Sequence, residues 1–219
     1  MEAQVNGVTL HYEVAGAGRA PMLLLHGNGE DHHIFDKIIP KLSSRFTVYA
    51  IDSRNHGLSQ KTDVYSYQTM ADDIYVFIEA LHLGEVGVIG FSDGAIVGLI
   101  LALSHGRVIR KMALLGLNLQ PGDFRDECRQ YIEETYAKTR DPLFKMMMEQ
   151  PSIALDEIRS ISIPTLLVAA ENDIYKPDTF TKIAAALPNA ELKIMTGHDH
   201  GSYIMGQDLM YDDFIRFFR

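Results

Sequence analysis

The sequence predicts an α/β protein with a doubly wound, mostly parallel sheet and helices on both of its faces. Two observations carry this prediction. Short apolar runs, typical of strands covered on both faces, alternate along the chain with segments whose apolar residues have helical spacing. Polar motifs follow directly after these runs, at the carboxyl ends of the expected strands, where parallel sheets bind their ligands.

Each expected element follows from its local pattern. Alternation around Asn6-Gly7, a type I′ turn signal, predicts a β-hairpin at the antiparallel edge of the sheet. Asp72 and Asp73 are expected in the N-terminal turn of a helix, where carboxylates complement the helix dipole. In chain order the expected elements are the hairpin 3–14, strand 21–25, helix 33–42, strand 46–51, helix 67–83, strand 86–89, helix 96–103, strands 111–117 and 164–170, helix 180–187, strand 191–195 and helix 209–218.

The composition bounds the class of protein. The 219 residues suffice for one domain with a large core, and a formal net charge of -9 disfavours nucleic acid as a partner. Cys128 is the only cysteine, so an intramolecular disulfide is excluded and a reducing cytoplasm is favoured. No leader pattern or run of about 18 apolar residues occurs, so we expect a cytoplasmic protein with no membrane partner. The oligomeric state stays open.

The stretch Gly90-Phe91-Ser92-Asp93-Gly94 joins an apolar strand to an apolar helix without loop residues. This G-x-S-x-G pattern is typical of a nucleophile elbow, a sharp turn that needs small neighbours around a strained serine. The helix N-terminus then directs free N–H groups and its positive dipole end toward Ser92. The pattern therefore indicates a catalytic serine.

Together with the motifs below, this elbow makes the chain resemble the α/β-hydrolase superfamily over nearly its whole length. The resemblance implies a single domain over residues 1–219. Ser92, Asp173 and His200 stand in the family order of nucleophile, acid and base, each just after a predicted strand. His26-Gly27-Asn28-Gly29 is similar to the family's H-G-x-G loop, which implies that Asn28 gives a backbone N–H to the oxyanion hole. Residues 52–59 are similar to its D-x-R-G-H-G-x-S loop, with Asn55 in place of a glycine.

The chemistry of these residues predicts a serine hydrolase. Ser92 needs a base to accept its proton, and His200 needs a carboxylate, Asp173, to fix its tautomer. The backbone N–H groups of Asn28 and Asp93 would hold the oxyanion. We expect cleavage of a small ester, thioester or related acyl substrate through an acyl-enzyme intermediate, with no cofactor and no metal. A serine at the elbow disfavours the alkyl-enzyme routes of haloalkane dehalogenases and epoxide hydrolases. A C–C bond hydrolase, a cofactor-free lyase or oxygenase, and a ligand receptor with little turnover are the alternatives on this fold.

Several site residues have rivals. His198 competes with His200 for the base, and Asp178 competes with Asp173 for the acid, although Asp178 fits a helix N-terminus better. His198 and His200, with Asp199 between them, could also form a metal pair, which would need a third ligand from elsewhere in the chain. The side chain of Asp93 is expected in solvent and is a candidate for meeting a cationic substrate group. His32 and His33 are expected to face solvent or the lid, and His56 to brace its loop.

Residues 118–163, here called the insertion, break the alternation of strands and helices and predict a small lid. Two or three short helices are expected, with helical patterns over residues 124–138 and 143–150 and breaks at Pro121, Pro142 and Pro151. The apolar residues expected to face Ser92 are Phe124, Tyr131, Tyr136, Phe144 and Met146 to Met148. Because so short an insertion encloses a modest pocket, we expect short or medium acyl groups to be preferred.

Overall fold

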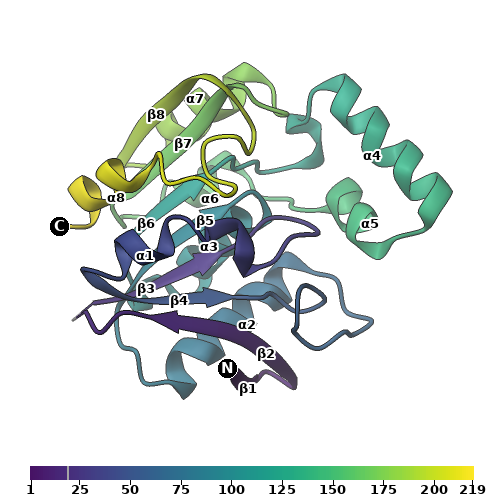
Figure 1. The fold of residues 1–219 in the computed structure, drawn as a ribbon. Coiled ribbons are helices and arrows are strands. Elements are labelled where there is room, and N and C mark those ends of the chain that lie inside the picture. The colour runs from purple at the N-terminus through teal and green to yellow at the C-terminus, as the bar shows by residue number, and fades with distance from the viewer. Residues whose placement is uncertain (19) are drawn as a thin grey trace.

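The computed structural model describes residues 1–18 and 20–219. Within them one eight-stranded sheet has the order β1-β2-β4-β3-β5-β6-β7-β8 (Figure 1). β1 and β2 form the expected antiparallel edge, and the strands from β3 to β8 run parallel. The doubly wound, mostly parallel sheet is therefore confirmed. The strands are β1 (Glu2–Val5), β2 (Val8–Ala15), β3 (Ala20–Leu25), β4 (Phe46–Ile51), β5 (Val86–Phe91), β6 (Ile109–Leu115), β7 (Thr165–Asn172) and β8 (Ala190–Asp199).

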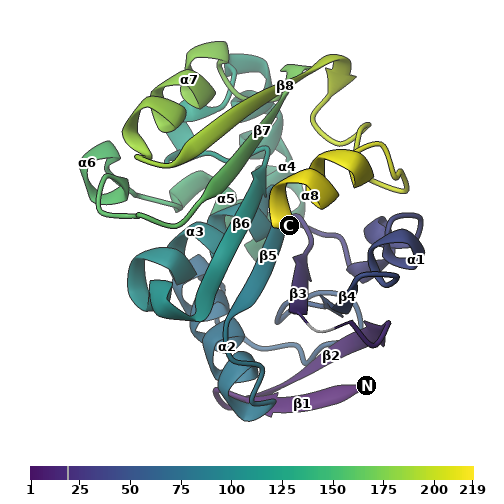
Figure 2. The same cartoon turned by 90° about the vertical axis from the view of Figure 1, so that its left-hand side faces the viewer.

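Helices cover both faces of this sheet, as Figure 2 shows. The longer helices are α2 (Tyr67–Ala80), α3 (Asp93–His105), α4 (Asp126–Thr139), α5 (Pro142–Glu149), α7 (Pro177–Ala186) and α8 (Tyr211–Phe218). Short helical turns are η1 (His32–Phe35), α1 (Ile39–Leu42), η2 (Gly106–Val108), η3 (Pro121–Asp123) and α6 (Leu155–Ile158). None of the helices in the described part of the chain has the length and apolar character needed to span a bilayer.

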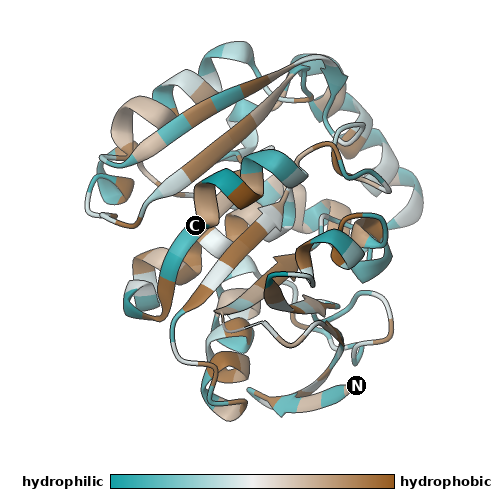
Figure 3. Ribbon diagram, turned by 60° about the vertical axis from the view of Figure 1, so that its left-hand side comes forward, coloured by the Kyte–Doolittle hydropathy of each residue, from teal (hydrophilic) through white to brown (hydrophobic). Residues whose placement is uncertain are grey.

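The sheet separates two apolar cores, because successive strand residues point to opposite faces. Val88 belongs to the core that also contains residues of α2, α3 and α7, and its neighbour Ile89 belongs to the core that contains residues of α1 and α8. The central strands are accordingly mostly hydrophobic (Figure 3). Burial on both faces explains why these strands are continuous apolar runs in the sequence.

The prediction of one continuous helix over residues 33–42 is wrong. The segment forms the 3-10 turn η1 and the four-residue helix α1, with Pro40 in the first turn of α1. Proline has no N–H and its ring clashes with the preceding turn, so a helix can begin near Pro40 but cannot pass through it.

Asp72 and Asp73 do not complement the dipole of α2 from its first turn, because the helix begins at Tyr67 and places both in its second turn. The Ser66 hydroxyl caps the N-terminus by accepting the Thr69 N–H. Asp73 is buried and binds Arg54 through two hydrogen bonds of 2.6 Å. Asp73 therefore forms a long-range ion pair with Arg54 instead of complementing the helix dipole.

The insertion connects β6 to β7 through η3, α4, α5 and α6. α4 and α5 lie against each other and extend beyond one end of the sheet (Figure 1). A backbone bridge ties the start of the insertion to the loop after β7, because Arg125 N–H donates to Ile174 O at 2.9 Å and Lys176 N–H donates to Asp123 O at 2.8 Å. The carboxyl ends of the strands and the insertion thus meet at the same edge.

Candidate active site

Ser92 occupies a sharp turn between β5 and α3. Its backbone has φ 53° and ψ -115°, a conformation that residues other than glycine rarely adopt, and Ser92 is 8% exposed. A Cβ at Gly90 would collide with the backbone of Gly94, and one at Gly94 would collide with the Leu25 carbonyl. The small residues of the motif are therefore needed for the close approach of three backbone segments.

A continuous chain of hydrogen bonds joins Asp173, His200 and Ser92. His200 Nε2 lies 3.0 Å from Ser92 Oγ, and His200 Nδ1 lies 2.8 Å from Asp173 Oδ1. The other Asp173 oxygen accepts the Ala170 N–H at 3.1 Å, which fixes the carboxylate. Because Nδ1 must donate to the carboxylate, Nε2 keeps a lone pair for the serine proton.

The rival residues lie elsewhere. His198 Nδ1 contacts the Ser202 hydroxyl at 3.1 Å, and Asp199 accepts backbone N–H groups of residues 201 and 202. These side chains are engaged separately and do not converge with His200 on a common point. Asp178 is near the N-terminus of α7 and pairs with Lys182 in solvent.

Asn28 and Asp93 face each other through their side chains. Neither of their backbone N–H groups has an acceptor among the described residues. Asn28 Nδ2 donates to Asp93 Oδ2 at 2.9 Å, and the Tyr67 hydroxyl donates to Asp93 Oδ1 at 2.8 Å. The two residues expected to supply the oxyanion hole are thus hydrogen-bonded to each other through their side chains.

The expectation of a solvent-exposed Asp93 side chain is wrong. The residue is 3% exposed, and burial raises the pKa of its carboxyl, against the opposing hydrogen bonds from Asn28 and Tyr67. Its partners are 65 and 26 residues away in the chain, so no local pattern in the sequence indicates this network.

Glu30 is a site residue that the sequence analysis missed. Its Oε2 accepts the Gly27 N–H at 2.9 Å and would lie 2.7 Å from a Cβ at Gly27, which itself would be 3.1 Å from Ser92 Cβ. Burial raises the pKa of Glu30 to about 7, although the Gly27 N–H and His200 oppose the rise. The only local signal is a carboxylate three residues after a loop glycine.

Tyr175 is a second missed residue. It is 1% exposed, and its ring stands edge-on to that of His200 with 5.4 Å between centroids. Burial, with Asp93 and Asp173 nearby, raises its pKa well above the usual value, while the interaction with Ser92 opposes the rise. The hydroxyl is therefore a neutral hydrogen-bond donor beside the serine.

The loop over residues 52–59 is built around buried Asp52. Burial raises the pKa of this carboxyl, but hydrogen bonds from the Leu58 N–H, the His32 N–H and the His32 ring bring it below its usual value. Asn55, in place of a glycine, has φ 69°, a conformation that asparagine tolerates. His56 donates to the Arg54 carbonyl at 2.9 Å and so braces the loop as expected.

His32 and His33 differ in their surroundings. His33 is exposed and contacts Asp36, in agreement with the expectation of a solvent-facing residue. His32 is only 6% exposed, so that expectation is wrong for it. Its ring turns inward because Asp52 offers a buried carboxylate 2.7 Å away.

The apolar side chains of the insertion divide into two groups. Phe124 is buried against Tyr175, with ring centroids 4.9 Å apart, and Met146 is buried in the core. Tyr131 is 65% exposed and contacts Phe144, so the expectation that it faces Ser92 is wrong. It lies on the outer side of α4, because the helical period directs Ile132 inward instead.

The chain is similar to known proteins with the alpha/beta hydrolase fold. Residues 20–146 match the family model of the alpha/beta hydrolase fold. The chain is 29% identical to the uncharacterized hydrolase YraK of Bacillus subtilis over 66% of this chain and 55% of that protein. It is 37% identical to the serine hydrolase BPHL of Mus musculus over 52% of this chain and 41% of the relative. The chain thus spans about half the length of these curated relatives.

A solved structure shares the architecture over the whole chain. The meta-cleavage product hydrolase from Pseudomonas fluorescens IP01 superposes with a TM-score of 0.84, covering 100% of this chain and 97% of that one. The sequence identity is 18%, so this similarity concerns the fold.

Proposed function

The chain belongs to the alpha/beta hydrolase fold family, and from that premise we propose that it is a serine hydrolase acting on small ester, thioester or related acyl substrates. The observation that carries the proposal is the hydrogen-bonded chain from Asp173 through His200 to Ser92. A serine hydroxyl is a weak nucleophile at neutral pH, and such a chain is the arrangement that activates it.

In the proposed reaction, Ser92 Oγ attacks the substrate carbonyl carbon while His200 Nε2 takes the hydroxyl proton. The negative charge on the carbonyl oxygen is stabilised by the N–H groups of Asn28 and Asp93, each worth about 3–4 kcal/mol. Collapse of this intermediate expels the leaving group, which receives the proton from His200. Water, activated by the same histidine, then hydrolyses the acyl-enzyme and restores the Ser92 hydroxyl.

The hydrogen bond between the side chains of Asn28 and Asp93 supports this use of their backbone N–H groups. A hydrogen bond between the two side chains fixes the separation of the two segments, so the N–H groups need not reorganise as charge develops. The Tyr67 hydroxyl holds Asp93 from the opposite side. The pair is thus a preorganised frame for the oxyanion.

We also propose that the insertion is a lid that closes a pocket for short or medium acyl groups. Phe124 supports this, because it packs on Tyr175 and thereby approaches His200. The substrate would be a small acyl compound of the cytoplasm, the compartment that a single free cysteine favours.

Labelling by a fluorophosphonate probe tests the proposal, since the reagent phosphonylates only an activated serine. We expect the wild-type protein to be labelled, Ser92→Ala and His200→Ala to lose labelling, and His198→Ala to keep most of it. Circular dichroism would show that each variant is folded. A folded wild-type protein that neither labels nor releases acid from a panel of esters would overturn the proposal and favour a ligand receptor.

A further inference from the structure

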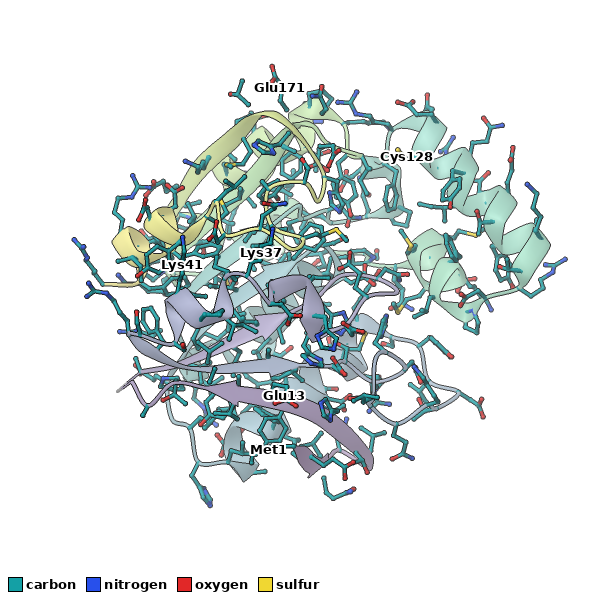
Figure 4. All side chains as sticks on the ribbon, in the orientation of Figure 1. Met1, Glu13, Lys37, Lys41, Cys128 and Glu171 are labelled. Atoms are coloured by element: carbon teal, nitrogen blue, oxygen red, sulfur yellow. The ribbon has the colours of Figure 1, made fainter. Side chains whose placement is uncertain are left out.

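A second group of polar side chains lies at the edge of the sheet. His11 and Glu13 are two residues apart on β2, so they point to the same face of the strand. η1 brings His32 to this face, with 5.5 Å between the ring centroids of His11 and His32. One candidate ligand atom from each of the three residues lies within 4.8 Å of the others. Figure 4 labels Glu13 on this strand.

The contact between His11 and Glu13 has the spacing of two ligands rather than the geometry of a hydrogen bond. His11 Nε2 lies 3.3 Å from Glu13 Oε1, yet this buried nitrogen forms no hydrogen bond with any described residue. Two atoms bound tetrahedrally to one Zn²⁺ at about 2.0–2.1 Å are about 3.3 Å apart. A buried nitrogen without a partner is costly unless something binds it.

His32 is prepared for the same task by Asp52. Its Nδ1 donates to Asp52 Oδ1 at 2.7 Å, which leaves the lone pair on Nε2. Asp52 is fully buried and is fixed by the backbone N–H groups of His32 and Leu58, each at 2.9 Å. A carboxylate behind a histidine is the usual support of a metal-binding imidazole, because it fixes the tautomer and raises the basicity of the ligand.

We propose that His11 Nε2, His32 Nε2 and the Glu13 carboxylate bind one divalent transition metal ion, with Zn²⁺ the best match. Two imidazoles and one carboxylate form a known zinc ligand set, and water would complete a tetrahedron. The Glu13 side chain is 53% exposed, so the ion can enter from solvent. The Met1 ammonium, 3.8 Å from Glu13, is an exposed partner that a divalent ion can displace.

This site uses none of the residues assigned to acyl transfer. The ion would join β2 to η1, which follows directly after the loop containing Asn28, and so would stabilise the fold beside that loop. A neighbouring set, Asp31, His32 and His33, also brings ligand atoms together. In that set, however, His33 is exposed and bound to Asp36, and Asp31 caps η1 through the His33 N–H, so its groups are already engaged.

Zn²⁺ titration of untagged, chelator-treated protein by calorimetry tests the proposal. We expect one site per chain, a rise in Tm with Zn²⁺, and the visible absorption of tetrahedral Co²⁺ when cobalt is used. His11→Gln and Glu13→Gln should each weaken Zn²⁺ binding by roughly 10–100-fold or more. Loss of a residue that only supports a ligand already costs about that much, and these changes remove a ligand itself. His33→Gln is the matched control and should bind as the wild type does.

The apo forms of these variants should unfold within a few degrees of the wild type, since Glu13 and His33 are exposed and glutamine keeps a polar side chain at each of the three positions. Reduced binding in a variant with an unchanged apo Tm then reports the loss of a ligand. Absence of a stoichiometric site in the wild type, or equal binding by wild type and His11→Gln, would overturn the proposal. Loss of binding in His33→Gln would assign the ion to the neighbouring set instead and would equally overturn it.

Discussion

Replacing Asp173 with asparagine should abolish most of the activity because the carboxylate accepts two hydrogen bonds and an amide can accept only at its oxygen. If the amide oxygen stays toward His200, the NH₂ group meets the buried Ala170 N–H, donor against donor. If the amide turns over, the NH₂ group faces His200 Nδ1 and forces the ring proton onto Nε2. Leaving the backbone N–H unpaired costs about 1–3 kcal/mol, so the second orientation should prevail.

With the proton on Nε2, His200 cannot accept a proton from Ser92. We therefore expect kcat to fall by about 10⁴, which corresponds to about 5.4 kcal/mol of lost transition-state stabilisation. Steady-state hydrolysis of p-nitrophenyl acetate measures this, with Tm recorded for each variant. Asp178→Asn is the matched control and should remain within about 2-fold of wild type, because Asp178 pairs with Lys182 in solvent. If Asp173→Asn keeps more than about a tenth of the activity, or Asp178→Asn loses as much, the assignment of the acid is refuted.

Three further outcomes are expected. Glu30→Gln should stabilise the protein by about 1–3 kcal/mol at pH 8 and hardly at pH 4. The pKa of Glu30 is raised from 4.5 to about 7 in the folded protein, so the wild type becomes less stable as the pH rises through this window, whereas glutamine does not titrate. Urea unfolding that gave the same difference at both pH values would contradict this. Asp73→Asn should cost about 3–5 kcal/mol in the same assay because it leaves Arg54 buried without a counter-charge, whereas a cost below about 1 kcal/mol would mean that the pair is dispensable. In a series of p-nitrophenyl esters from acetate to palmitate, kcat/KM should be highest for short or medium chains, and a maximum at palmitate would require a channel that the insertion does not provide.

Much of the fold could be predicted because its signals are local. Each central strand is buried on both faces and therefore consists of consecutive apolar residues, and Ser92 is flanked by the two glycines that its turn requires. Ser92, Asp173 and His200 could be singled out because each follows a recognisable strand. The apolar spacing around Pro40 predicts a continuous helix, and the proline interrupts it.

The rest of the site depends on contacts between distant segments. The inward turn of His32 depends on Asp52, and the burial of Asp93 depends on Asn28 and Tyr67. A single sequence carries no local trace of such pairs, because a buried polar residue and an exposed one look alike until their partners are known. The expectation that polar residues gather at the carboxyl ends of the strands rests on topology alone, whereas their individual surroundings depend on these long-range contacts.

The backbone bridge at the start of the insertion determines how this protein could be re-engineered. Residues 123–125 pair with 174–176, and Leu119 O accepts the Ile153 N–H at 3.0 Å, so both stems of the insertion are bonded to the body or to each other. A graft that exchanged all of residues 118–163 would disturb the segment that carries Asp173. The transplantable module is the hairpin of α4 and α5, and a donor hairpin should be joined after Arg125 and before Gln150, whose side chain binds the backbone of Tyr65 and Tyr67.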